Sequence, residues 1–216
     1  MKTILVLATR NIGKTKEIRQ MLQNFNVEIK NLDDFGPIPE IEEDGNTFEE
    51  NAYKKASFAS RILGYPAIAD DSGLVVEALN GTPGVRSARY AGNNATDEMN
   101  LKKLIKEMEK FPDPTIRKAA FECVISIATP TGAALTYEGR CEGLLLDEPK
   151  GDGGFGYDPI FFYPELKKTF AELSIEEKSL ISHRGMAFKE IISEFDKILT
   201  WIDINMPQFE PVKCKL

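Results

Sequence analysis

The stretch LVLATRNIGKTKEI, residues 5–18, decides how the rest of the fold is interpreted. Residues 2–8 are rich in Ile, Val and Leu, which is typical of a buried strand. Ile18, Met21 and Leu22 share one face of a helix that we expect from about residue 14 to residue 23. The stretch therefore predicts a strand, a glycine turn and a helix in immediate succession.

The turn in this stretch nearly spells the phosphate loop G-x-x-x-x-G-K-[ST]. Residues 13–15 supply the final Gly-Lys-Thr, but Ala8 stands where the first glycine belongs. Backbone N–H groups at a helix N-terminus, the helix dipole and Lys14 together favour an anion, and Thr9 and Asn11 add side-chain hydrogen bonds. Taken alone, the pattern fits a phosphate site or an ordinary strand-to-helix turn with a surface lysine.

Composition and charge restrict the partners. The chain has 216 residues, 42% of them hydrophobic, which is enough for one sizeable core or two closely packed lobes. Its formal net charge of −7 argues against broad binding to nucleic acid or to an anionic membrane surface. No segment approaches the roughly 20 apolar residues of a membrane span. We therefore expect a small-molecule ligand, no nucleic acid and no membrane.

The cysteines indicate a reducing compartment. Cys123, Cys141 and Cys214 are widely spaced and odd in number, and they form no C-x-x-C pair. The apolar run at the start of the chain ends at polar residues 9–11, well below signal-peptide length. We expect a cytoplasmic protein.

Further elements follow from periodicity and turn residues. Thr47 and Glu50 predict a capping box before a second helix that Gly64 ends. YPAIADDSGLVVEAL, residues 65–79, is expected to form two short strands around an acidic turn. A third helix is expected near residues 96–109, and a strand, a turn and a returning strand over residues 120–146.

The C-terminal third begins with a glycine-rich loop and ends in a helix. Ser174 and Glu177 predict another capping box. A single long amphipathic last helix is expected from the helical spacing of Phe188, Ile191, Ile192, Phe195, Leu199 and Ile202. We find no internal repeat and expect one domain over residues 1–205 with a loose tail at 206–216.

Two acidic clusters could hold a metal. EIEEDG, residues 40–45, contains Glu43, and DDSG, residues 70–73, contains Asp71. Mg²⁺ favours one or two carboxylates together with waters and substrate phosphates, so these two side chains would suffice. Residues 40–45 alone also fit a solvated acidic loop. Because adjacent strand residues point to opposite faces, Asp70 and Asp71 are not expected to share one role.

The cationic candidates gain meaning only as a group, because most such residues are solvated. They are Lys54, Lys55, Arg86, Arg89, Lys178 and Arg184. His183 could be a base, a donor to a ligand or a packing residue. In GGFGYDP, residues 153–159, Phe155 and Tyr157 could close over a flat base, or both could belong to the core.

Six blocks together resemble the inosine/xanthosine triphosphate pyrophosphatase family, whose members cleanse the nucleotide pool of deaminated purine triphosphates. They are ATRNIGKTKE, TFEENAYKKA, AIADDSGL, GTPGVRSARYAG, GGFGYDPIFF and EEKSLISHRG, and they occur in the family's order over nearly the whole chain. The resemblance implies an α/β fold with an elongated mixed sheet, flanking helices and two lobes around a central nucleotide-binding cleft. It also implies a homodimer that uses Mg²⁺ to split a nucleoside triphosphate into monophosphate and pyrophosphate.

The resemblance also assigns residues. The triphosphate cradle would comprise Thr9, Arg10, Asn11, Ile12, Gly13, Lys14 and Lys55. Glu43 and Asp71 would bind the metal, Asp71 would also be the proton acceptor, and Ser72 would contact the substrate. The nucleobase pocket would comprise Phe155, Gly156, Tyr157, Asp158, Lys178, His183 and Arg184. Arg10 departs from the pattern, because many members have glycine there; it could contact phosphate or point to solvent.

The implied chemistry needs no covalent nucleophile, because water can attack the α-phosphorus directly while a metal neutralises the departing pyrophosphate. Two alternatives stay open. A P-loop kinase or ATPase would use the strand before Asp70 and Asp71 to hold Mg²⁺, although Ala8 argues against it. A nucleotide-sensing module would bind the same ligand without turnover, although paired carboxylates have little use there unless a metal binds.

Overall fold

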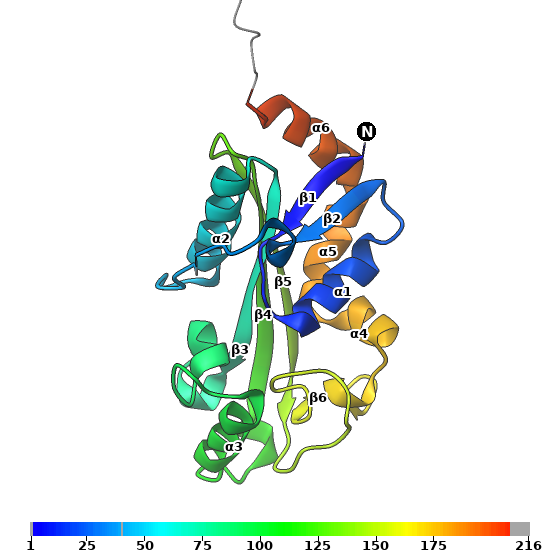
Figure 1. The fold of residues 1–216 in the computed structure, drawn as a ribbon. Helices are drawn as coiled ribbons and strands as arrows, with labels where there is room; N and C mark the ends of the chain where they lie inside the picture. Colours follow the sequence, from blue (N-terminus) through cyan, green and yellow to red (C-terminus); the bar gives the residue numbers. More distant parts are fainter. Residues whose placement is uncertain (1, 40, 208–216) are drawn as a thin grey trace, which may run out of the picture.

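The computed structural model of the chain describes residues 2–39 and 41–207 (Figure 1). Seven strands form one mixed sheet in the order β2-β1-β3-β4-β5-β6-β7. The strands are β1 Thr3–Leu7, β2 Val27–Asn31, β3 Ala67–Val76, β4 Lys118–Ala128, β5 Ala134–Leu145, β6 Phe161–Tyr163 and β7 Lys168–Thr169. β1 is parallel to β2 and β3, and all other neighbours are antiparallel. The predicted α/β class and the mixed sheet are confirmed.

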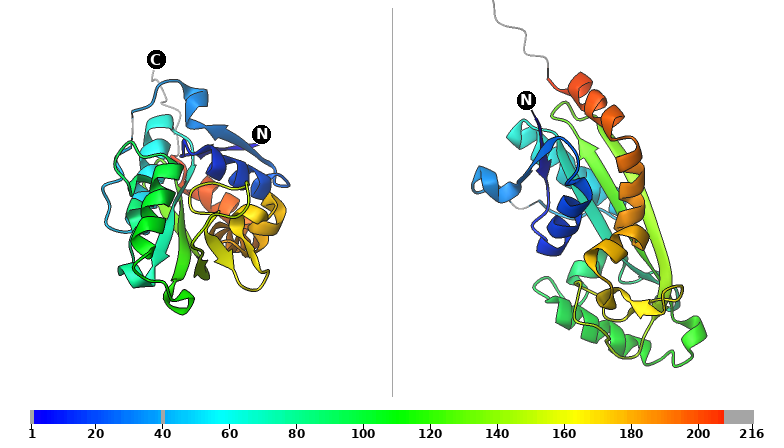
Figure 2. Two further views of the ribbon diagram at one scale, coloured as in Figure 1. Left: turned by 90° about the horizontal axis from the view of Figure 1, so that it is seen from below. Right: turned by 90° about the vertical axis from the view of Figure 1, so that its right-hand side faces the viewer.

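Helices cover both faces of this sheet (Figure 2). They are α1 Ile12–Leu22, α2 Phe48–Leu63, α3 Asp97–Met108, α4 Ile175–Ile181, α5 His183–Ser193 and α6 Phe195–Asn205. α2 packs on β3 and β4, and α5 packs on β4 and β5 from the opposite face. None of the helices within residues 2–39 and 41–207 combines the length and the apolar character needed to cross a bilayer.

The apolar core is divided along the long axis of the molecule. One cluster packs α1, α5 and α6 on the sheet and includes Ile18, Phe188 and Ile202. Another lies at the opposite end, where Leu104 of α3 packs with Phe161 of β6. The long strands β3, β4 and β5 connect the two ends. This arrangement is the elongated shape expected from the resemblance.

The expected acidic turn at Asp70 and Asp71 is wrong, because β3 is one continuous strand. It pairs with β4 along its whole length, from Ala67 opposite Ala128 to Val76 opposite Ala119. Both carboxylates find cationic partners beside the strand, so the chain has no need to turn outward to solvate them.

The expected single last helix is also wrong, because the chain leaves helical geometry at Glu194 (φ −116°, ψ 9°) between α5 and α6. Phe188, Ile191, Phe195, Ile198 and Ile202 are all buried on the same side, so the apolar period continues through the break. Periodicity alone could not reveal it. Ile192 is 39% exposed, against expectation.

Helix boundaries agree in most places. α1 begins at Ile12, two residues before the expected start, because Asn11 is its N-cap. Gly64 ends α2 with φ +74°, and Ser174 and Glu177 form the expected capping box. The box at Thr47 is only half present: Thr47 Oγ1 accepts from Glu50 N, but Glu50 Oε2 accepts from Asn46 N. Of the expected tail 206–216, residues 208–216 lie outside the described residues.

Candidate active site

A cavity of about 330 Å³ lies between the N-terminus of α1, the middle of β3 and the loop that precedes β6. Most of the predicted site residues line it: Thr9, Arg10, Asn11, Lys14, Glu43, Lys55, Asp71, Ser72, Phe155, Gly156, Tyr157, Asp158, Lys178, His183 and Arg184. Ile12 and Gly13 do not appear among the lining residues, and the Ile12 side chain is 71% exposed. One cavity therefore brings together segments from the whole chain.

The turn into α1 is held by its own side chains. Thr9 Oγ1 accepts from Asn11 N at 3.2 Å, and Asn11 Oδ1 accepts from Lys14 N at 3.0 Å. Asn11 therefore caps the helix and directs its N-terminal end, the positive pole of the helix dipole, toward the cavity.

Gly13 makes room for the aromatic loop. A Cβ atom on Gly13 would lie 2.5 Å from Phe155 Cδ1, so a side chain here would displace the ring. Lys178 Nζ lies 4.7 Å from the centroid of the Phe155 ring. Phe155 is thus held between the turn and a cation, with part of its surface exposed.

Arg10 makes a contact that differs from both roles considered for it, a phosphate contact and exposure to solvent. Its Nη2 donates a hydrogen bond to the carbonyl oxygen of Ile38 at 2.8 Å. The contact fastens the turn before α1 to the segment that leads to Glu43.

Asp70 and Asp71 point to opposite sides of β3, as expected for adjacent strand residues. Asp70 is fully buried; it accepts from Arg184 Nε at 2.8 Å and from Cys123 Sγ at 2.9 Å, and it pairs with Lys14. Burial alone would raise the pKa of Asp70, but Arg184 and Lys14 outweigh this effect and hold the pKa well below its usual value. Asp70 therefore holds the cationic side chains of Lys14 and Arg184 in place.

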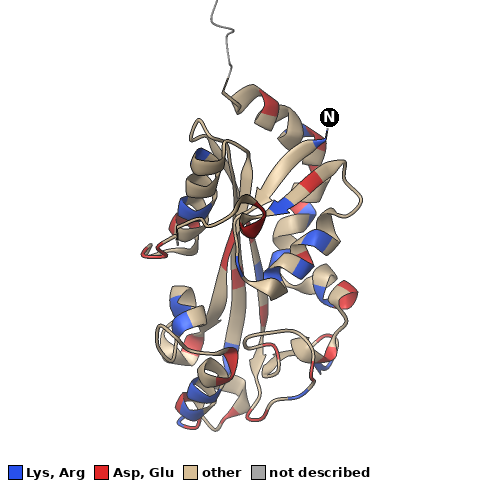
Figure 3. Ribbon diagram, viewed as in Figure 1, with Lys and Arg blue, Asp and Glu red and all other residues tan. Residues whose placement is uncertain are grey.

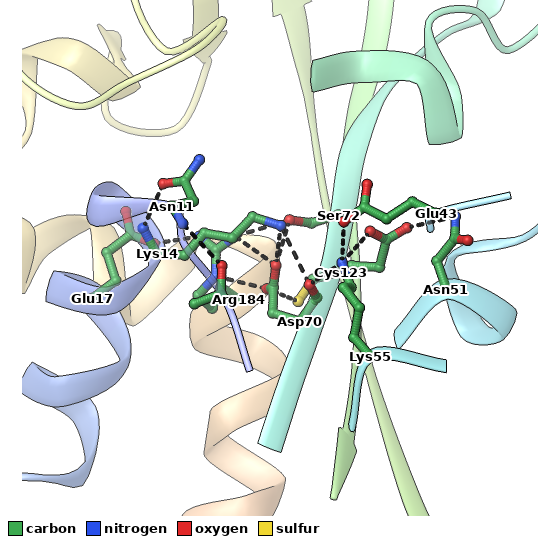
Figure 4. Close-up of polar contacts among 12 residues, drawn as sticks. Asn11, Lys14, Glu17, Glu43, Asn51, Lys55, Asp70, Ser72, Cys123 and Arg184 are labelled. Atoms are coloured by element: carbon green, nitrogen blue, oxygen red, sulfur yellow. Dashed lines mark hydrogen bonds and ion pairs between the residues drawn. The ribbon is translucent and has the colours of Figure 1, made fainter. Parts of the chain in front are cut away.

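Asp71 shares one ammonium group with Glu43. Lys55 Nζ lies 2.6 Å from Asp71 Oδ1 and 2.9 Å from Glu43 Oε1, and it also donates to the carbonyl of Asp70 at 2.8 Å. Figure 4 shows Glu43 and Lys55 on one side of β3, with Lys14 and Arg184 on the other. Burial raises the pKa of Asp71 despite the opposing charge of Lys55. Glu43 is also desolvated, but Lys55 lowers its pKa overall.

The two carboxylates could together hold a divalent metal. Within residues 2–39 and 41–207, no group of three or more His, Cys, Asp or Glu is arranged to hold a metal unaided. Glu43 and Asp71 approach one point closely enough to contact the same ammonium, and both line the cavity. Because hard divalent cations accept one or two carboxylates when a ligand's phosphates and water complete the shell, this donor pair suits a metal held jointly by protein and ligand.

Buried charges of alternating sign extend from α1 along the cavity wall. Lys178 Nζ lies 2.6 Å from Asp158 Oδ2 and 2.8 Å from Glu17 Oε1, and Glu17 also pairs with Arg184. Arg184 Nη2 donates to Ser72 Oγ at 2.9 Å. This network orients the cations without leaving a buried charge unpaired.

His183 is buried beside the network. Its ring stacks on Phe121 with centroids 4.8 Å apart, and desolvation holds its pKa well below 6.5, so the imidazole is neutral at pH 7. Its Nδ1 has no hydrogen-bond partner among the described residues. A neutral and buried imidazole is poorly suited to acid–base catalysis.

The aromatic residues of GGFGYDP divide between two roles. Tyr157 is buried, and its hydroxyl donates to the carbonyl of Ser87 at 2.9 Å, so its ring belongs mainly to the core. Phe155 is less buried and faces the charged network. Asp158 accepts from Phe155 N at 2.9 Å and thereby fixes the loop.

Two polar residues at or beside the site, Glu17 and Asn51, were not predicted from the sequence. Glu17 is only 8% exposed and Asn51 is fully buried. Both residues lie on predicted helices, next to apolar positions. A polar residue at the edge of an apolar helix face is the sequence feature that could have identified them. Of the other cationic candidates, Arg89 contacts Glu43, whereas Lys54 pairs with Asp44 away from the cavity.

Comparison with known proteins agrees with this site. A model of the Ham1 family matches residues 5–194. Proteins named dITP/XTP pyrophosphatase from Desulfotalea psychrophila and Syntrophobacter fumaroxidans are 55% and 57% identical, over 99% and 92% of this chain and 94% and 84% of theirs.

Solved structures agree as well. A HAM1 protein from Coxiella burnetii is 42% identical with a TM-score of 0.82, over 90% of this chain and 99% of its own. The Ham1 protein of Staphylococcus aureus is 41% identical with a TM-score of 0.79, over 91% of this chain and 100% of its own. The fold and site define a nucleotide-processing α/β protein. This chain belongs to the Ham1 family, which confirms the resemblance found in the sequence.

Proposed function

We propose that this protein hydrolyses the deaminated purine nucleoside triphosphates ITP, dITP and XTP to a nucleoside monophosphate and pyrophosphate. One observation carries the proposal: a single cavity is lined by a cationic helix N-terminus, two carboxylates, an aromatic ring and further polar groups. The relatives named dITP/XTP pyrophosphatase support the same activity. The reaction would keep deaminated bases out of DNA and RNA.

The phosphate end supplies charge. The turn from Thr9 to Lys14, with Lys55, would bind the triphosphate, and Glu43 and Asp71 would hold Mg²⁺. When bound, the metal would neutralise charge on the departing pyrophosphate. Asp71 would orient and deprotonate the water that attacks the α-phosphorus.

The base end supplies selectivity. Inosine and xanthosine carry an oxygen at position 6, where adenosine carries an amino group. Donors of the His183–Arg184 segment would face that oxygen, while Phe155 would stack on the ring. Adenine would present a donor to these donors and leave them unpaired, and polar mismatches of this kind discriminate by about 10⁴-fold or more.

A substrate panel tests the proposal. ITP, XTP, dITP, GTP and ATP are incubated separately with enzyme and Mg²⁺, and pyrophosphate and orthophosphate are both quantified. We expect pyrophosphate from ITP, XTP and dITP at rates far above that from ATP. Orthophosphate or a phosphorylated acceptor would favour a P-loop kinase or ATPase. Tight binding of ITP without turnover would favour a sensing module.

We also propose a homodimer in the cytoplasm. The resemblance to the family supports the dimer, and sedimentation equilibrium at micromolar concentration would test it, with a mass near 24 kDa counting against it. Cys123 and Cys141 are buried and unpaired, which suits a reducing compartment.

A further inference from the structure

Asn51 is a buried side chain of the site that the proposed function does not use. It lies on α2, has no exposed surface and does not line the cavity. Its two ends contact two different parts of the proposed metal site. Oδ1 accepts from the backbone N–H of Gly45 at 2.8 Å, and Nδ2 donates to Asp71 Oδ2 at 3.3 Å.

These contacts fix which way the amide points. A backbone N–H can only donate, so the atom that faces Gly45 must be the amide oxygen, and the NH₂ group must face Asp71. Lys55 occupies the other oxygen of Asp71 at 2.6 Å. The carboxylate is therefore held at both oxygens, and its plane is set by the helix rather than by the strand alone.

The contact to Gly45 matters because Glu43 lies in the connection between η1 (Leu32–Phe35) and α2, whose described residues, 36–39 and 41–46, form no helix or strand. Gly45 follows Glu43 by two residues. A Cβ atom on Gly45 would lie 2.6 Å from Asn51 Oδ1, so the backbone approaches the amide as closely as a glycine permits. Asn51 thereby ties the loop that carries one proposed ligand to the side chain of the other.

We propose that Asn51 is a positioning residue that sets the spacing between Glu43 and Asp71 for the divalent metal. This inference rests on the proposed metal-binding role of these two carboxylates. Groups that hydrogen-bond to metal ligands commonly change metal affinity or activity by about 10–100-fold when they are replaced.

The same helix contains a control for this inference. Ser60 of α2 is also fully buried, and its Oγ donates to the backbone carbonyl of Tyr65 at 2.6 Å. Unlike Asp71 and Glu43, Ser60 does not line the cavity.

The experiment compares Asn51→Leu with Ser60→Ala, because each change removes a buried hydrogen bond of α2 and only the first touches a proposed metal ligand. Mn²⁺ binding is measured by electron paramagnetic resonance in the presence of α,β-methylene-ITP, and the half-saturating Mg²⁺ concentration is measured with ITP as substrate. We expect Asn51→Leu to weaken Mn²⁺ binding and to raise the Mg²⁺ requirement by about 10-fold or more. Ser60→Ala should leave both metal values unchanged.

A purely structural role for Asn51 predicts lower stability in both variants and unchanged metal values, and that result would overturn the inference. If Asn51→Leu does not fold, Gly45→Ala tests the same hydrogen bond by a change in the loop. It should weaken Mn²⁺ binding as well, and wild-type affinity in that variant would equally overturn the inference. A wild-type enzyme that binds no Mn²⁺ removes the metal site and this inference with it, whereas Mn²⁺ binding without hydrolysis of ITP contradicts only the proposed function.

Discussion

Asp71 is the residue on which the proposed chemistry depends most. Replacing it by Asn keeps the size and shape of the side chain but removes a base and a charged metal ligand. Since a positioned base alone contributes typically 10²–10⁴-fold, we expect kcat for ITP to fall at least about 100-fold. Asp44→Asn is the control, because Asp44 is exposed and pairs only with Lys54 among the described contacts. A wild-type rate in Asp71→Asn would remove this residue from the mechanism.

Phe155 is expected to act on binding rather than on the chemical step. Stacking of a base on an aromatic ring contributes about 1–3 kcal/mol, so Phe155→Ala should raise KM for ITP about 10-fold with a smaller change in kcat. Phe155→Tyr keeps the ring and should restore the affinity. Steady-state kinetics with both variants measures the effect, and an unchanged KM in Phe155→Ala would argue against stacking.

At the scale of elements, α1 presents its N-terminus to the proposed phosphate position. Asn11→Ala removes the N-cap of α1, and Thr96→Ala removes the equivalent cap of α3. Each change should lower the free energy of unfolding by about 1 kcal/mol. Only Asn11→Ala should also raise KM for ITP, by several-fold, because the Asn11 side chain belongs to the cavity lining and Thr96 does not. Urea unfolding and initial rates measure both effects, and equal kinetic effects in the two variants would contradict this role of α1.

The sequence predicts elements well where a local signal exists. Caps and glycines locate α1, α2 and α4 because each is a contact between neighbours in the chain. The continuity of β3 depends instead on partners brought by α1, α2 and α5, so the two aspartates looked like a turn. The break at Glu194 leaves the apolar period intact and has no sequence signal of that kind.

The same contrast between local and long-range signals applies to the residues of the site. The motifs identified most residues that line the cavity, because each block carries its own pattern. Glu17 could not be placed from sequence, since its partner Lys178 lies 161 residues away. Asn51 has the same difficulty, because a helical pattern does not tell which strand residue its amide will face.

At the scale of the whole molecule, Glu17 connects α1 to α4 and α5 through Lys178 and Arg184. Burial alone would raise its pKa, but these two cations lower the pKa below its ordinary value of 4.5. Near and below pH 4.5 the unfolded chain therefore takes up a proton that the folded protein does not. This contribution to stability is present at neutral pH and is lost as the pH falls through the lowered pKa of Glu17.

We therefore predict that the free energy of unfolding falls less between pH 6 and pH 3.5 in Glu17→Gln than in the wild type, although the variant is less stable at pH 6. Urea denaturation at a series of pH values measures the difference. Glu28→Gln, a change at an exposed position beside Lys30, should leave the acid dependence as in the wild type. An identical acid dependence in Glu17→Gln would show that the buried network does not control acid stability.

The long strands β3, β4 and β5 run through both ends of the molecule, so we propose that residues 1–205 unfold as one unit.

The central claim of the account is that the protein hydrolyses ITP between its α- and β-phosphates. Hydrolysis of ITP in H₂¹⁸O, with both products analysed by mass spectrometry, tests it most directly. Attack on the α-phosphorus predicts one ¹⁸O atom in the monophosphate and none in the pyrophosphate. Label found only in pyrophosphate, or in released orthophosphate, would contradict the account.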